Sequence, residues 1–425
     1  MTLKKLSFFV PVALVVSCAV FAEVTIKSSA DEAPAKVGER VTFTISGLQD
    51  MEPVLNAQTV QNMHKHEKIT IDRKGKDEVV RHFKVEAPGT FLLAVDLGKG
   101  FGKNYADSAF CSVMVAPEKV TPSGTAPKDL LKYWDGVKRE MKNIPATPKL
   151  TRIDSEPGIE LYEFEIAAGK GVLGSSAGVK AVGYMAKPEG AGPFPAVVTF
   201  YGAGSFEALK NDGIDYAKKG MIGWSVNPHP LANDLTQQQK DELKATLLKD
   251  YNQKGKDTKL EDVYFNGMFK RCYQVVQAIK QMPEWDGKIL IARGFSQGGA
   301  QTIATAFLCP EVSHIAPQCP AMCDLTGNLV WRKGGWPFWV KSGYDKKEIE
   351  TAGYFDMVNF APHIKAKLFL FAGGIDGACP AGGVVAFYNQ YAGPKDILIL
   401  PDVAHARPNE VYKREAAFIM EAIGK

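Results

Sequence analysis

A serine, an aspartate and a histidine occur in an order that is typical of nucleophilic catalysis. Ser296 is the centre of a Gly-x-Ser-x-Gly motif, and Asp376 and then His405 follow it along the chain. In such a triad the histidine accepts the proton of the serine hydroxyl, while the carboxylate orients the imidazole and stabilises its cation. Taken singly, Asp376 is equally consistent with a turn acid and His405 with a surface histidine, whereas the context of Ser296 favours a nucleophile over a plain turn. Together, their order predicts a hydrolase with a serine nucleophile.

The segment around Ser296 has the pattern of a strand, a sharp turn and a helix. Residues 289–292 are aliphatic, Gly294 and Gly298 flank the serine, and residues 301–308 are compatible with a helix. A turn at a single residue strains its backbone, and the glycines keep side chains out of the crowded bend. The start of the helix would place backbone N–H groups beside the hydroxyl, where an oxyanion develops.

The acid and the histidine also come just after predicted strands. The segments 367–372 and 397–401 are apolar, and Asp376 and His405 follow them closely. Because ligands collect at the carboxyl ends of the strands in open α/β sheets, we expect both side chains at that edge. Asp402 is a rival acid, but it stands so close to His405 in the chain that reciprocal orientation would be awkward.

Strands and helices alternate through residues 129–425, which predicts a largely parallel sheet with helices on both faces. With the triad order, this pattern indicates an α/β-hydrolase fold. The loop 201–205 (Tyr-Gly-Ala-Gly-Ser) follows a predicted strand and either donates an oxyanion N–H or is a glycine-rich bend without chemistry. The elements predicted to build and cover this sheet include helices at 129–141 and 267–282 and strands at 161–166, 180–186, 195–200 and 222–226.

Three further features of this region are open to more than one interpretation. Residues 238–256 are highly charged and are predicted to form a solvated surface helix. His229 is predicted to be structural, since no motif ties it to a serine or an acid. A tryptophan-rich segment could stack on sugar rings or roof the pocket, or it could pack an insertion onto the sheet. Its candidate substrate-binding residues are Trp331, Trp336 and Trp339.

Residues 23–118 have the pattern of a small all-β, immunoglobulin-like sandwich domain. Alternating or apolar runs at 39–45, 90–95 and 109–115 are separated by turn residues. Residues 119–128 are the predicted linker. The domain could bind carbohydrate or serve as a spacer or packing domain, and we favour the second. His64, Lys65 and His66 are expected in a solvated loop.

Residues 1–22 have the pattern of a secretory signal peptide. Lys4 and Lys5 precede an apolar run, and Val20-Phe21-Ala22 forms a small-residue cleavage site. Cleavage before Cys18 with lipid anchoring is the alternative, but apolar residues rather than a polar tether follow that cysteine. We therefore expect export to the periplasm or the medium. No later segment is long and apolar enough to span a membrane.

Charge and cysteine content narrow the classes of partner. The formal net charge of +4 comes without a basic cluster, so nucleic acid is not an expected partner. Six cysteines follow the leader, and their pairing cannot be deduced from the sequence. Cys319 and Cys323 resemble half of a metal site, but no second half follows, so no metal or cofactor is predicted.

Further motifs flank the triad residues. They are Glu284–Lys288 before the nucleophile, Tyr354–Asp356 with Asn359–Ala361, Asp376–Ala381, Phe387–Asn389 and Pro401–His405. In combination, these motifs resemble those of the acetyl xylan esterase/cephalosporin-C deacetylase family, over about residue 127 to the C-terminus. The resemblance implies deacetylation of short acyl esters, typically on xylan-type sugars, through an acyl-enzyme and without metal. It also implies that Gln297 and Ala203 supply the oxyanion N–H groups.

Two departures from the family's pattern are visible. The family usually has a tyrosine where Ala203 stands, and its Arg-Gly-Gln-Gly motif is replaced by Asn227–Pro230. The family's ring-like assembly makes a homo-oligomer an expectation of the resemblance, which these departures weaken. The sequence thus predicts an exported serine esterase acting on an acetylated carbohydrate. A serine peptidase on the same fold and a non-catalytic glycan-binding protein are the alternatives.

Overall fold

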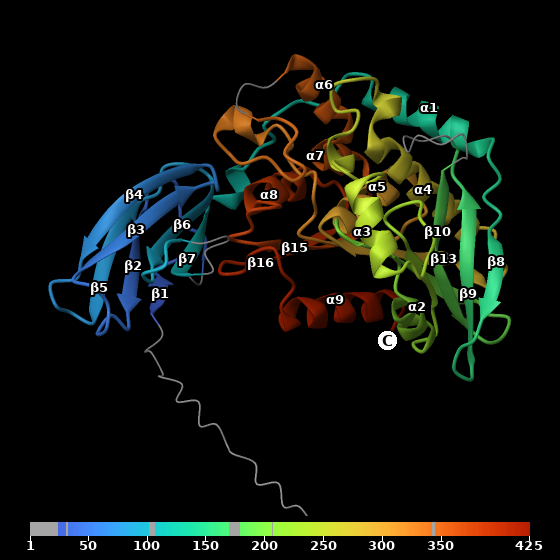
Figure 1. Ribbon diagram of the computed structural model, residues 1–425, viewed down its shortest axis with the longest axis horizontal. Coiled ribbons are helices and arrows are strands. Elements are labelled where there is room, and N and C mark those ends of the chain that lie inside the picture. The colour runs from blue at the N-terminus through green and yellow to red at the C-terminus, as the bar shows by residue number, and fades with distance from the viewer. Residues whose placement is uncertain (1–23, 31–32, 102–106, 170–178, 206, 342–344) are drawn as a thin grey trace, which may run out of the picture.

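The computed structural model describes residues 24–30, 33–101, 107–169, 179–205, 207–341 and 345–425 (Figure 1). The predicted signal peptide, with the lipid-anchoring alternative at Cys18, lies outside these residues. Within them, no helix combines the length and the apolar character that crossing a membrane requires. The described chain forms an N-terminal β part and a larger α/β part, which lie side by side in Figure 1.

The N-terminal part is a sandwich of two antiparallel sheets, with strand orders β1-β2-β5 and β4-β3-β6-β7. In β2, the side chains of Val41, Phe43 and Ile45 are fully buried and alternate with more exposed residues, so one face of the strand packs on the core. The predicted all-β domain is confirmed. The strands are β1 (Thr25–Ser28), β2 (Arg40–Ser46), β3 (Val54–Gln61), β4 (Lys65–Asp72), β5 (Glu78–Lys84), β6 (Gly89–Asp96) and β7 (Ser108–Val115).

The expectation of a solvated loop at residues 64–66 is wrong for its last two residues. Strands β3 and β4 form a hairpin in which Gln61 pairs with Lys65 and Val60 pairs with His66. The sequence of β4 has little apolar alternation because it is an edge strand, and polar or charged residues are typical of such edges. His64 lies in the turn between the two strands.

The α/β part is built on a nine-stranded sheet of order β16-β15-β14-β13-β11-β12-β10-β9-β8. The strands from β11 to β16 pair in parallel, and β8, β9 and β10 form an antiparallel edge. The predicted α/β-hydrolase fold is confirmed. The strands are β8 (Lys149–Ile153), β9 (Ile159–Ala167), β10 (Lys180–Pro188), β11 (Phe194–Phe200), β12 (Ile222–Val226), β13 (Trp285–Phe295), β14 (His314–Gln318), β15 (Lys367–Gly373) and β16 (Lys395–Leu400).

Helices cover both faces of this sheet, with α2 and α9 on one side and α1, α4, α5 and α8 on the other (Figure 1). The helices are α1 (Leu130–Lys142), α2 (Lys210–Ala217), α3 (Gln237–Ala245), α4 (Tyr264–Ile279), α5 (Gln297–Leu308), α6 (Lys346–Phe355), α7 (Met357–Phe360), α8 (Ala381–Gln390) and α9 (Asn409–Ala422). The short 3-10 helices are η2 (Pro117–Lys119), η3 (Tyr251–Gln253), η4 (Leu260–Asp262), η5 (Gly327–Val330) and η6 (Ala361–His363).

The helix predicted over 238–256 is only half right. Helix α3 begins after Thr236, whose side chain and that of Gln239 form a capping box, but it ends at Ala245. The chain then passes through η3, where the half-buried side chain of Tyr251 turns inward. Tertiary contacts of this aromatic residue, described below, replace the continuation of a solvated helix.

The sandwich packs directly against the loops that follow β15 and β16 (Figure 1). Ile375, which is 1% exposed, is buried in one apolar cluster with Val60 and Leu92 of the sandwich. The hydroxyl of Ser112 in β7 donates a hydrogen bond of 2.6 Å to the carbonyl oxygen of Pro401. These loops carry Asp376 and His405, so the N-terminal part adjoins the candidate site.

Candidate active site

Ser296 lies at the sharp turn from β13 into α5, and its backbone is strained. Its φ and ψ angles are 59° and −121°, which a residue with a side chain rarely adopts. A Cβ added to Gly298 would lie 2.4 Å from the carbonyl oxygen of Phe200, and one on Gly294 would lie 2.8 Å from that oxygen. The predicted strain and the need for glycine on both sides of the serine are confirmed.

The structure brings Ser296, His405 and Asp376 together in one relay. The distance from Ser296 Oγ to His405 Nε2 is 2.8 Å, and that from His405 Nδ1 to Asp376 Oδ2 is 2.7 Å. The His405 side chain is 22% exposed, whereas that of Asp376 is fully buried. A base in contact with both a hydroxyl and a buried carboxylate is the geometry that activates a serine.

The carboxylate of Asp376 is held in place from its other side. Its Oδ1 accepts hydrogen bonds of 2.8 Å from the N–H groups of Ala378 and Cys379. Oδ2 therefore remains directed at the imidazole. Asp402, the rival acid in the sequence, has an exposed side chain, and it is Asp376 that contacts His405.

Of the two residues predicted to form the oxyanion hole, Gln297 follows the nucleophile in the chain and Ala203 follows a glycine that approaches it. Gln297 is the first residue of α5, and an N–H at this helical position has no partner within the helix. Ala203 lies exposed in the turn after β11. That turn runs close to the nucleophile, because a Cβ on Gly202 would be 3.6 Å from the Cβ of Ser296.

The side chain of Gln297 belongs to a buried aromatic and polar cluster that sequence reasoning missed. Its Oε1 accepts a 2.5 Å hydrogen bond from Tyr251, whose ring contacts the ring of His229 with a 4.8 Å centroid separation. His229 Nδ1 is 2.6 Å from the hydroxyl of Tyr264. Burial, aided by the charge of Arg271, lowers the pKa of His229 to about 3, so the imidazole is neutral. The prediction that His229 is structural agrees with this burial.

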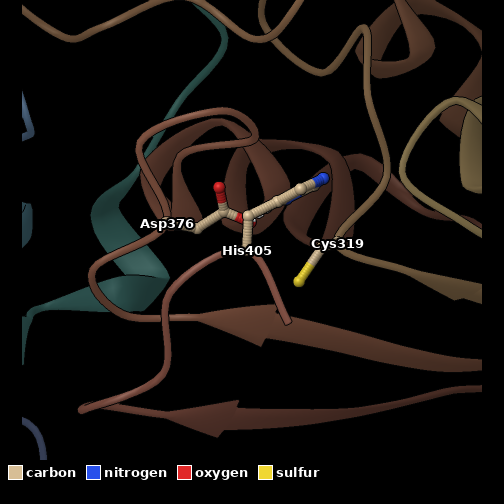
Figure 2. A group of neighbouring side chains, drawn as sticks. All are labelled: Cys319, Asp376 and His405. Atoms are coloured by element: carbon tan, nitrogen blue, oxygen red, sulfur yellow. Dashed lines mark hydrogen bonds and ion pairs between the residues drawn. The ribbon is translucent and has the colours of Figure 1, made fainter. Parts of the chain in front are cut away.

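Cys319, Asp376 and His405 are the one group in the described residues whose side chains could together hold a metal ion (Figure 2). Their potential ligand atoms lie within 4.8 Å of one another. The imidazole is already engaged on both nitrogens, and burial together with the charge of Asp376 raises the pKa of the Cys319 thiol well above its usual range. Because metals bind the thiolate, this arrangement favours the relay over a metal centre.

The three predicted substrate-binding tryptophans have different environments. Trp339 is fully buried and donates through Nε1 to the carbonyl oxygen of Asn252, so it packs the core and cannot contact a sugar. Trp336 is half-buried, and its ring centroid is 6.5 Å from that of Tyr251. Trp331 is 75% exposed. The segment therefore both packs the domain and presents an aromatic surface.

A sequence profile of the acetyl xylan esterase family, AXE1, matches residues 118–422. The chain belongs to the acetyl xylan esterase family. The resemblance seen in the flanking motifs is thereby confirmed, and the match begins after β7, so the sandwich lies outside it. Members of this family are carboxylic ester hydrolases, and so is this protein.

Similar proteins agree with this assignment. The acetyl esterase Axe7A of Xylanibacter ruminicola is 28% identical over 304 residues, which is 69% of this chain and 67% of that protein. Acetyl xylan esterase 1 from Thermoanaerobacterium sp. has a TM-score of 0.62 at 21% identity, covering 72% of this chain and 97% of its own. The acetyl xylan esterase from Paenibacillus sp. R4 has a TM-score of 0.61 at 20% identity, covering 72% and 98%. The family and the shared fold together support an acetyl esterase.

Proposed function

We propose that this esterase removes acetyl groups from carbohydrate esters, such as acetylated xylan or its oligosaccharides, by a Ser-His-Asp acyl-enzyme mechanism. The observation that carries the proposal is the continuous relay from Ser296 through His405 to Asp376, with contacts of 2.8 and 2.7 Å. The acetyl xylan esterase family and its named members support an acetyl ester on a sugar as the substrate. The leader-like residues 1–22 support export.

In the first half of the reaction, His405 Nε2 takes the proton of Ser296 as Oγ attacks the acetyl carbonyl carbon. The imidazolium that forms is stabilised by Asp376, whose carboxylate faces Nδ1. The negative charge on the carbonyl oxygen is stabilised by the backbone N–H groups of Gln297 and Ala203. The tetrahedral intermediate then breaks its bond to the sugar oxygen, which leaves as a hydroxyl after taking the proton from His405.

In the second half, water replaces the sugar. His405 removes a proton from this water, whose oxygen attacks the acetyl carbon of the acyl-enzyme. Collapse of the second intermediate releases acetate and returns the proton to Ser296 Oγ. Tyr251, which bonds to the side chain of Gln297, and Trp336, whose ring lies beside that of Tyr251, are the residues that we expect to line the space for the small acyl group.

The test is release of acetate by the full-length Ser296→Ala variant from p-nitrophenyl acetate and from acetylated xylo-oligosaccharides. We expect kcat to fall by about 10⁴-fold or more, because the nucleophile is lost. Ser46→Ala is the matched control, since this serine lies in β2 of the sandwich, where its hydroxyl bonds to Glu78. It should retain wild-type rates.

Two results would contradict the proposal. Undiminished turnover by Ser296→Ala would show that Ser296 is not the nucleophile. Cleavage of peptides without cleavage of acetyl esters would show that the same triad serves a peptidase. Covalent labelling of the wild type, and not of Ser296→Ala, by a fluorophosphonate gives an independent readout of an activated serine.

A further inference from the structure

The sandwich and the tryptophan-rich segment meet at one surface beside the triad. The N–H of Lys333 donates a 3.1 Å hydrogen bond to the carbonyl oxygen of Asn62 in the β3–β4 turn. In the same turn, the ring of His64 lies edge-on to the ring of Trp331, with a centroid separation of 5.7 Å and an interplanar angle of 89°. Residues from both parts of the protein therefore form this surface, which is called the junction below.

Trp331 occupies the junction in an unusual way. It directly follows η5, its φ angle is 58° and its side chain is 75% exposed. A large aromatic residue in left-handed backbone conformation costs free energy, and an exposed ring recovers little of it through burial. A flat, exposed indole held in this way is suited to stacking on the apolar face of a sugar ring.

The junction is also positively charged. The ammonium of Lys333 is half-buried and lies 5.1 Å from the ring centroid of Phe338. Burial lowers the pKa of Lys333, and the nearby carboxylate of Asp376 partly offsets this. The segments of Lys333 and His64 meet through the hydrogen bond of the Lys333 N–H to Asn62 and through the ring contact of Trp331 with His64.

The charge of Lys333 is not neutralised by a contact carboxylate. Among the described residues, no Asp or Glu oxygen lies within 4.0 Å of its ammonium, and Asp376 is committed to His405. Partial burial against an aromatic ring, without a contact carboxylate, leaves the ammonium less solvated than in water, so a ligand that brings a carboxylate gains a charge-assisted hydrogen bond there. The junction adjoins the loop that carries Asp376, because Met63 of the same turn and Ile375 belong to one buried apolar cluster.

We infer that Trp331, Lys333 and His64 form a subsite for an acidic sugar, a uronic-acid residue carried next to the acetylated sugar of the substrate. The indole stacks on the sugar ring, the ammonium binds its carboxylate, and the turn of the sandwich closes the side of the subsite through His64. The inference rests on the proposed deacetylase function and narrows its substrate to acidic, acetylated oligosaccharides. It also makes the N-terminal sandwich part of the binding site.

The experiment compares two acetylated xylo-oligosaccharides that differ only in a uronic-acid branch. For the full-length wild type, we expect kcat/KM to be about tenfold higher on the acidic substrate, and this ratio to fall as ionic strength rises. Lys333→Met should bring the ratio close to one, while Lys333→Arg should retain most of it. Trp331→Ala should lower kcat/KM on both oligosaccharides by about tenfold.

Lys341→Met is the matched control, because this lysine belongs to the same part of the chain and is exposed. It makes the same change in net charge and should leave the ratio as in the wild type. Affinity is measured in parallel by calorimetry on the Ser296→Ala variant, which reports binding without turnover. The acidic oligosaccharide should bind that variant about tenfold more tightly than the neutral one.

The inference is overturned if the wild type shows no preference for the acidic substrate, or if Lys333→Met keeps the preference. Either result, together with normal hydrolysis of p-nitrophenyl acetate, would leave the esterase function intact. Absence of ester hydrolysis by the wild type would instead refute the proposed function. In that case, equal binding of the two oligosaccharides by Ser296→Ala would overturn the subsite as well.

Discussion

His229 is a buried, neutral imidazole, and its burial makes the stability of the fold depend on pH. The residue is 1% exposed, and Tyr264, Tyr251 and the guanidinium of Arg271 surround its ring. Removal of the ring from water, together with the positive charge of Arg271, disfavours the charged imidazole. The pKa of His229 is consequently lowered from 6.5 to about 3. The cluster also holds Tyr251 against Gln297 beside the nucleophile.

The sign of the effect on stability follows from this lowered pKa. Between pH 6.5 and about 3, the unfolded chain binds a proton at His229 and the folded protein does not, so acidification favours unfolding. We expect the free energy of unfolding of the wild type to fall relative to His229→Gln below pH 6.5, by up to about 1.4 kcal/mol per pH unit. Urea denaturation of both proteins at pH 7, 6, 5 and 4 measures it, and a pH-independent difference would contradict the buried neutral ring.

The three relay residues could be predicted from the sequence, while their closest helpers could not. Ser296 is marked by a motif with a backbone reason, and Asp376 and His405 follow strands whose apolar runs are visible. Tyr251 and Lys333 carry no such signal, because each acquires its role through a contact with a residue far away in the chain. Charged and aromatic side chains in loops therefore remain ambiguous until the fold is known.

At the scale of elements, the close approach of α5 to β11 sets the position of the nucleophile. Gly298 is helical, and replacing a helical glycine by alanine ordinarily stabilises a helix by about 1 kcal/mol. Here a Cβ would lie 2.4 Å from the carbonyl oxygen of Phe200, so helix and strand must separate. We expect Gly298→Ala to lower the melting temperature, to cost about 1–3 kcal/mol and to reduce kcat at least tenfold.

Gly136→Ala is the control for this prediction. Gly136 is a helical residue of α1, and its added Cβ would have Arg139 as its nearest neighbour, at 3.8 Å. This variant should be as stable as the wild type or slightly more stable, with unchanged activity. Equal melting temperatures for both variants would show that the contact between α5 and β11 does not constrain the elbow.

Prediction of the elements succeeded where a face of the element is buried. Strands such as β2 and β11 and helix α4 reveal themselves through apolar periodicity because the core selects their residues. Strand β4 was missed, since an edge strand with mostly exposed residues has no apolar face to display. Helix α3 was predicted too long, because charge alone does not indicate where a helix ends.

At the scale of the molecule, the sandwich is a support for the loops that carry the acid and the histidine. Ile375, the neighbour of Asp376, is buried against the sandwich, and the loop leading to His405 is bound through Pro401 to Ser112. The backbone N–H of Ile375 also donates to the carbonyl oxygen of Val403, which couples the two loops. A shift of the sandwich would therefore move both ends of the imidazole–carboxylate contact.

This coupling makes Ser112 the position at which to test the support. A Cβ on Gly374 would already lie 2.4 Å from Ser112 Oγ, so no space exists between β7 and the acid loop. We expect Ser112→Leu to push that loop away and to reduce kcat on p-nitrophenyl acetate at least tenfold, because misplacement by about 1 Å can cost far more.

Ser112→Ala should lose only the hydrogen bond to Pro401, about 1 kcal/mol of stability, and keep most of the activity. Thr42→Leu, in β2 of the other sheet, controls for an added leucine in the sandwich. Full activity in Ser112→Leu, with a wild-type circular dichroism spectrum, would show that the catalytic loops hold their positions without the sandwich.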